Sequence, residues 1–186
     1  MVLDPQALVC LLRSDLPIAI YPCATKEGPF AYGPHNSFWK LNDLQFIATL
    51  QPRLRSYLAF AFSQSNRMDF LQAVEDDAPA AVLQEIGKRP HNVWETAVWI
   101  EIAQRRLVRR ADGHFRIIPA GEVLPGDTVL QSELRPVRVK VRDDGQFTWE
   151  KAEGPTNFWL FDRGDPRRNE EALREALPAL YQSFRP

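Results

Sequence analysis

The stretch LDPQALVCLLRSDLPIAIYPCAT, residues 3–25, decides the expected fold. Asp4 followed by Pro5 is typical of a helix start, because aspartate caps the first turn and proline suits its first position. The apolar residues that follow surround most of this helix, which predicts that it is buried. PIAIYPC, residues 17–23, is short, rich in β-formers and bounded by prolines, which predicts a strand buried on both faces. Helix, turn and buried strand indicate an α/β fold with a mostly parallel sheet flanked by helices.

Two helical regions and a long loop are expected in the middle of the chain. Residues 24–38 contain two Gly-Pro breaks and predict a loop at the end of the buried strand, where α/β proteins bind ligands. Residues 39–64 have a mainly helical pattern, interrupted once by proline. HNVWETAVWIEIAQRR, residues 91–106, predicts a helix that begins with a capping box between Asn92 and Glu95.

The second half of the chain has strand patterns followed by a helix. Alternating apolar and polar residues predict a β-rich insertion near 107–150, with a hairpin turn at the Asp-Gly pair of residues 144–145. Residues 157–161 predict another short strand, and residues 165–184 carry the apolar stripe of a final helix. We therefore expect residues 1–186 to form a single α/β domain or half-domain.

Composition excludes several classes of protein. The chain has 186 residues, 45% of them hydrophobic, and a net charge of −1. This balance gives no general attraction to nucleic acid or acidic membranes, so we expect neither as a partner. We expect no secretory leader, because the start lacks a basic region followed by an apolar one, and no apolar run reaches the roughly 20 residues of a membrane span. Cys10 and Cys23 are the only cysteines, and we interpret them as buried free thiols of a cytoplasmic protein rather than a disulfide or metal pair.

The candidate site residues come from the loop and from the start of the 91–106 helix. His35 and Asn36 lie in the loop, close to where a ligand at the sheet end would bind. His91 and Trp94 flank the predicted helix start and are further candidates for binding a substrate. Glu95 is either a metal ligand or only the second residue of the capping box. No phosphate loop, nucleophile elbow or zinc motif is present, so no catalytic residue is assigned.

Four segments together resemble a known family. They are LDPQALVCLLRSDLPIAIYPCAT (3–25), HNVWETAVWIEIAQ (91–104), LPGDTVLQ (124–131) and TNFWLFDRGDPRRNEEALREALPALY (156–181). Their order resembles the C-terminal half of the inosine-uridine-preferring nucleoside hydrolases, with Pro22 and Thr25 at matching places of the family's strand end. The resemblance implies the fold of that family with its N-terminal half absent from this chain.

The resemblance also implies a chemistry, namely hydrolysis of the N-ribosidic bond of a nucleoside or a related ribosyl compound. Members of that family hold calcium through an aspartate cluster and a late-helix His-Asp pair, and the ion orients water and sugar. The aspartate cluster has no counterpart here, so calcium is expected only if another segment completes the site. The His-Asp pair corresponds to Trp94-Glu95. Glu95 keeps a carboxylate, whereas Trp94 can stack on a base but cannot protonate it.

Three functions therefore remain open. The chain is a divergent nucleoside hydrolase-like enzyme, or it is a non-catalytic binding or interaction module derived from that fold. A divided sheet exposes an apolar edge, so the module would self-associate or recruit a partner chain. The third is a carbohydrate-binding protein that uses the aromatic loop FAYGPHNSFW, residues 30–39.

Overall fold

The computed structural model describes residues 4–63, 68–130 and 133–184. Its α-helices are α1 (Pro5–Leu12), α2 (Pro52–Phe62), α3 (Phe70–Glu75), α4 (Ala80–Gly87), α5 (Thr96–Ile102) and α6 (Pro166–Ser183), and the 3-10 helices are η1 (Gln45–Thr49) and η2 (Ala120–Glu122). The strands are β1 (Ile18–Ile20), β2 (Trp39–Leu41), β3 (His91–Val93), β4 (Arg105–Arg109), β5 (Phe115–Pro119), β6 (Thr128–Val129), β7 (Glu133–Val141), β8 (Phe147–Lys151) and β9 (Phe158–Asp162). No helix in this described part combines the length and apolarity needed to cross a membrane.

The largest sheet has four strands in the order β1-β9-β7-β8. Only β1 and β9 run parallel, whereas β7 pairs antiparallel with both β8 and β9. The expectation of a mostly parallel sheet is therefore wrong. The reason is local, because a tight turn at Asp144-Gly145 joins β7 to β8, and a tight turn can join only antiparallel neighbours.

Two smaller sheets complete the architecture. β2 and β3 form an antiparallel ribbon, and β4 lies between β5 and β6 in a three-stranded sheet. The strands predicted near 107–150 are present, but they do not form one insertion. β4, β5 and β6 make up the small sheet, while β7 and β8 belong to the largest sheet.

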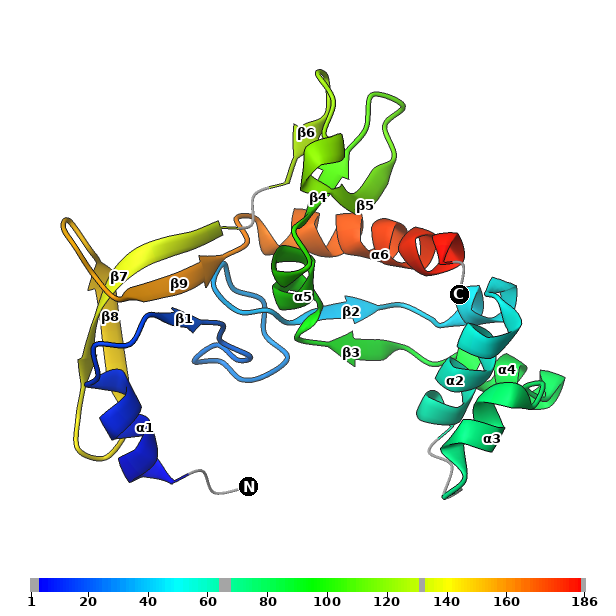
Figure 1. The fold of residues 1–186 in the computed structure, drawn as a ribbon, viewed down its shortest axis with the longest axis horizontal. Helices are drawn as coiled ribbons and strands as arrows, with labels where there is room; N and C mark the ends of the chain where they lie inside the picture. The colour runs from blue at the N-terminus through cyan, green and yellow to red at the C-terminus, as the bar shows by residue number, and fades with distance from the viewer. Residues whose placement is uncertain (1–3, 64–67, 131–132, 185–186) are drawn as a thin grey trace.

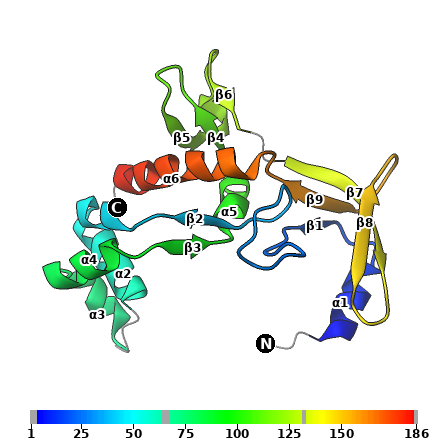
Figure 2. The same cartoon turned by 180° about the vertical axis from the view of Figure 1, so that it is seen from behind.

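The elements are spread along an extended molecule (Figure 1). The largest sheet and α1 lie at one end, and the short helices α2, α3 and α4 lie at the other. The long helix α6 runs between them, with the β2–β3 ribbon on one side and the three-stranded sheet on the other (Figure 2). Two separate hydrophobic cores follow from this arrangement.

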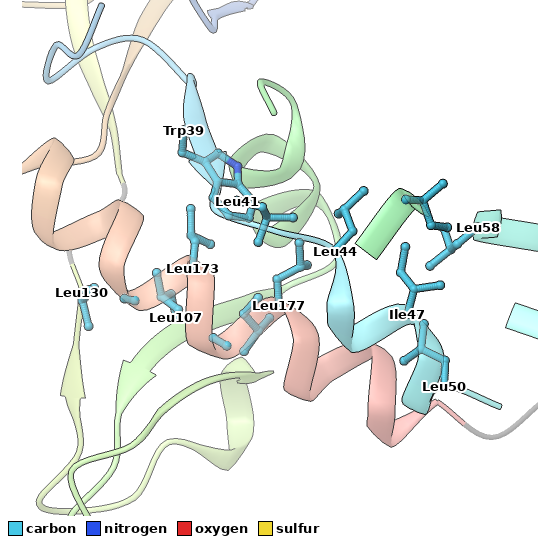
Figure 3. Close-up of a cluster of buried hydrophobic side chains, with 14 of the residues drawn as sticks. Trp39, Leu41, Leu44, Ile47, Leu50, Leu58, Leu107, Leu130, Leu173 and Leu177 are labelled. Atoms are coloured by element: carbon cyan, nitrogen blue, oxygen red, sulfur yellow. The ribbon is translucent and has the colours of Figure 1, made fainter. Parts of the chain in front are cut away.

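The larger core lies between α6, the β2–β3 ribbon, η1 and the small sheet. In Figure 3, Leu173 and Leu177 point from α6 toward the side chains of Trp39 and Leu41. Trp39 is completely buried in this core, and Leu173 is too. The apolar stripe of the predicted final helix is therefore confirmed as a packing face, and Pro178 lies within that helix.

The smaller core belongs to the largest sheet. Its buried members are Leu12 of α1 and Val137, Phe158 and Leu160 of the sheet. Four buried side chains make a small core, because hydrophobic stabilisation grows with the apolar area removed from water. This end of the molecule therefore has less internal packing than the α6 end.

A buried carboxylate connects α6 to the rest of the molecule. Glu170 is 2% exposed and accepts hydrogen bonds from the Tyr32 hydroxyl and, at 2.9 Å, from the backbone N–H of Lys40. Arg174 pairs with Glu170 at 2.7 Å and donates to the Lys40 carbonyl at 2.7 Å. Arg167 lies 4.0 Å from the centre of the Tyr32 ring, a cation–π contact. The two helix side chains thus bond β2 where a neighbouring strand would otherwise pair.

The first element has the predicted cap but less burial than expected. The Asp4 carboxylate accepts from the backbone N–H groups of Gln6 and Ala7, which confirms the helix start. Burial on most sides is wrong, because Leu11 is 44% exposed and α1 covers only one face of the sheet. Burial of the first strand on both faces is also wrong. Ile18 and Ile20 pack against the small core and are only partly buried, and Ala19, which lies on the opposite face of the strand, is exposed.

The two cysteines differ from their expected burial. Cys10 lies on the outer side of α1, and Cys23 lies in the chain that leaves β1. Both are free and exposed, so the interpretation of them as buried thiols is wrong. The physical reason is that α1 and β1 are each covered on one side only.

The expected boundaries of two helices also change. Residues 39–41 form β2 instead of a helix, and the helix of this region begins at Pro52 and ends at Phe62. The predicted extension to residue 64 reaches outside the described residues. The capping box is wrong, because Asn92 pairs with Lys40 in the β2–β3 ribbon. Glu95 does precede α5, but its side chain makes no capping hydrogen bond.

We expect Glu170→Ala to lower the free energy of unfolding by about 3 kcal/mol, because it removes one partner of a buried, hydrogen-bonded ion pair. Urea unfolding followed by circular dichroism measures this loss. Glu171→Ala is the matched control, since Glu171 is the exposed neighbour on the same helix and should change stability by less than about 0.5 kcal/mol. Equal effects of the two variants would show that the buried carboxylate has no special role.

Candidate functional site

The loop of residues 24–38 is held in one conformation by Asn36. The Asn36 side chain is buried, and its Oδ1 accepts from the Gly33 N–H at 2.9 Å. Its Nδ2 donates to the Ala31 carbonyl at 2.9 Å. Both ends of the amide are therefore used inside the loop. The structure gives Asn36 the role of organising the loop that carries His35.

The side chain of Arg163 also stabilises the loop, through hydrogen bonds to its backbone and to Asn36. This residue follows β9 and is 2% exposed. Its guanidinium donates to the Gly33 carbonyl at 3.2 Å, to Asn36 Oδ1 at 3.2 Å and to the Phe38 carbonyl. Burial lowers the pKa of Arg163 to about 10, which still leaves the side chain charged at neutral pH. All three contacts fix the loop to the end of β9.

His35 lies between the loop and the largest sheet. Its Nδ1 is 3.1 Å from the Phe161 carbonyl, and because a carbonyl only accepts, Nδ1 carries a proton. In the neutral ring, Nε2 is then an acceptor. The His35 ring meets Trp149 of β8 edge-to-face, with centroids 4.8 Å apart and planes at 80°. His35 and Trp149 are thus brought together from segments more than a hundred residues apart.

Two cavities adjoin the His35–Trp149 pair. One, of about 560 Å³, includes Pro22, Thr25 and Asn36 in its lining, and the other, of about 420 Å³, lies on the β7–β8 side. Both are also lined by His35, Trp149 and Leu160. Their volumes are within the range of small-molecule sites. Trp149 is 42% exposed, so part of its indole remains available for stacking.

The charged groups at this site largely balance one another. On the β7–β8 side, Arg135 pairs with Glu133 at 2.7 Å and with Asp162 at 2.9 Å, and Lys151 adds one more cation. On the loop side, Lys26 and Glu27 are of opposite sign. A site of this kind favours a neutral polar ligand with a flat ring over a strongly charged one.

Trp94 lies in a different cluster on the other side of the loop. Its ring centroid is 5.8 Å from that of Phe30 and 5.5 Å from that of Phe38, and its indole N–H donates to the Pro29 carbonyl at 3.2 Å. Tyr32 also contacts Phe38, at 5.1 Å. Trp94 therefore packs against the loop, and its one hydrogen-bond donor is used there.

His91 and Glu95 are not brought to the cavities either. His91 is on β3, where its ring meets Phe62 edge-to-face at 4.6 Å, and burial lowers its pKa. Glu95 is exposed at the start of α5. Of the five predicted site residues, the structure thus brings only His35 and Asn36 to one cavity.

The described residues do not fit a calcium site. Nowhere in residues 4–63, 68–130 and 133–184 do three His, Cys, Asp or Glu side chains come close enough to share a metal ion. Calcium takes six to eight oxygen ligands, several of them carboxylates. Glu95 is exposed and belongs to no such group.

Sequence reasoning missed the three side chains that shape this site, namely Trp149, Arg163 and Glu170. Trp149 has a readable signal, because Phe147 and Trp149 alternate with polar residues in a strand pattern and so share one face. Arg163 and Glu170 carry no such signal, since an arginine after a strand and a glutamate on a helix are normally exposed.

Comparisons with protein-family models, with curated proteins and with solved structures gave no match.

We expect Asn36→Ala to lower the free energy of unfolding by about 2 kcal/mol, because it leaves the Gly33 N–H and part of the Arg163 guanidinium without an acceptor. Hydrogen exchange of the 31–38 backbone should become faster at the same time. Asn92→Ala serves as the control, since the Asn92 side chain has no hydrogen bond within the described residues. If Asn36→Ala leaves stability unchanged, the organising role assigned to this amide is wrong.

Proposed function

We propose that this chain is a non-catalytic interaction module that is completed by another polypeptide. The observation that supports the proposal is its accessible surface of 11886 Å². A compact folded monomer of 21.3 kDa exposes roughly 9,100 Å². The excess of about 2,800 Å² on this one chain is at least as large as the roughly 1,000–2,500 Å² that each partner buries in a permanent complex.

The excess surface includes many large apolar side chains. Those that are at least half exposed are Leu16, Phe30, Met68, Leu71, Trp99, Ile102, Leu124 and Phe184. They come from both ends of the molecule, from α5, from the loop of residues 24–38 and from the segment that follows η2. Isolated apolar residues are normal on a protein surface, but aromatic and aliphatic side chains of this number favour a protein interface.

We expect the chain recovered from the cells that naturally contain it to be part of a complex larger than its own 21.3 kDa. Native mass spectrometry of the tagged chain, expressed at its normal level, measures the mass directly. A free monomer with a cooperative melting temperature that does not depend on concentration would contradict the proposal.

A second candidate function is binding of a nucleoside or a related ribosyl compound at the His35–Trp149 site. It is favoured by the larger cavity, because this cavity brings His35 and Asn36 together with Pro22 and Thr25, the two strand-end residues of the family resemblance. A base can stack on the exposed part of Trp149, and the sugar hydroxyls can bond to the polar lining.

For this second function we expect inosine to quench the tryptophan fluorescence of the chain in a saturable manner, and Trp149→Ala to remove the saturable part. Trp99→Ala is the control, because Trp99 is an exposed tryptophan on α5 that lines neither cavity. Quenching that persists in Trp149→Ala would exclude the site. Release of ribose from inosine, assayed with and without added calcium, tests separately for hydrolysis.

A further inference from the structure

The outer edge of β1 presents the backbone of one residue in the middle of the strand. Ile18 pairs with Phe158 in parallel register, and the Ile18 N–H donates to the Asn157 carbonyl at 2.8 Å. Backbone groups alternate in direction along a strand, so the N–H and C=O of Ala19 point away from β9. No described strand lies on that side, and Ala19 is exposed.

This edge is complementary to itself. If two copies are related by a two-fold axis at Ala19, each Ala19 N–H faces the Ala19 carbonyl of the other copy. The two reciprocal bonds are those of an antiparallel hydrogen-bonded pair. We propose that the polypeptide which completes this chain is a second copy of it, an inference that rests on the function proposed above. The four-stranded sheets of the two copies would join through β1 into one continuous eight-stranded sheet.

Two other open edges, those of β2 and β8, are less suited to such pairing. On the outer side of β2, the Lys40 backbone is already bonded by Glu170 and Arg174. β8 carries Glu150 and Lys151, and charged side chains on an edge strand oppose pairing with another chain. β1 is uncharged along Ile18–Ile20, so no side-chain charge opposes its approach.

The surroundings of β1 favour a second copy as the occupant. The sheet end has only four buried core residues, so joining two sheets would enlarge a core that is small on its own. A net charge of −1 gives little repulsion between two copies. Pro17 and Pro22 limit the free edge of β1 to a few residues. Because a two-fold contact pairs the β1 edge of one copy with the β1 edge of the other, neither β1 edge remains open and the assembly closes at two chains.

Light scattering after size exclusion, with the purified chain at several concentrations, tests the proposal. We expect a mass of two chains for the wild type and of one chain for Ala19→Pro, which removes the outward N–H. Lys151→Pro is the matched control. The β7–β8 hairpin register, set by the Arg142 bond to Gln146, turns the Lys151 N–H to the outer edge of β8. This control should remain dimeric.

A cross-linking variant keeps the test valid if Ala19→Pro fails to fold. In a Cys10→Ser, Cys23→Ser background, Ala19→Cys should form an intermolecular disulfide on mild oxidation, because Cα atoms of such a pair lie about 5.5 Å apart. Lys151→Cys in the same background should not. A monomeric wild type, or equal cross-linking of both variants, would overturn the proposal. If the purified chain is monomeric but the native complex is larger than one chain, the proposal of a second copy is wrong. The proposal of an interaction module then still holds, with a different polypeptide as the partner.

Discussion

The buried carboxylate of Glu170 is the interaction on which the other elements depend. It lies on α6, yet it bonds the backbone of β2 and the hydroxyl of Tyr32 in the loop. Burial, together with the Glu170 hydrogen bond, raises the pKa of Tyr32, so this hydroxyl remains a donor. Because Arg174 neutralises the carboxylate and also bonds the Lys40 carbonyl, the charge is compensated within one turn of helix. Helix, ribbon and loop therefore take their positions together.

The conformation of the loop of residues 24–38 depends on the Glu170 hydrogen bonds and on Arg163. Asn36 and the Arg163 guanidinium satisfy the loop carbonyls and the Gly33 N–H from within. These polar groups are already bonded within the loop, whereas His35 keeps one ring nitrogen and Trp149 keeps part of its indole available. The chain thus separates the residues that shape the loop from those that can contact a molecule in the cavities.

The division into two cores gives the molecule its open form. One core is centred on α6, and the other contains four side chains under α1. An α/β chain of this size normally gathers its strands into one sheet and covers both faces. Here nine strands are divided among three sheets within the described residues, which leaves apolar side chains and the β1 edge exposed. The proposed interface with another polypeptide is our explanation for both kinds of exposure.

The sequence by itself determined the local elements. It identified the cap at Asp4, the turn at residues 144–145 and the apolar stripe of α6, because each depends on hydrogen bonds or spacing within a few residues. It also singled out His35 and Asn36 as residues of one loop. Only the tertiary structure decided which strands pair, that Asn92 belongs to a ribbon, and that Trp149 reaches His35. These contacts join residues that are far apart in the sequence, more than a hundred positions apart for His35 and Trp149. Local propensity carries no information about partners at that separation.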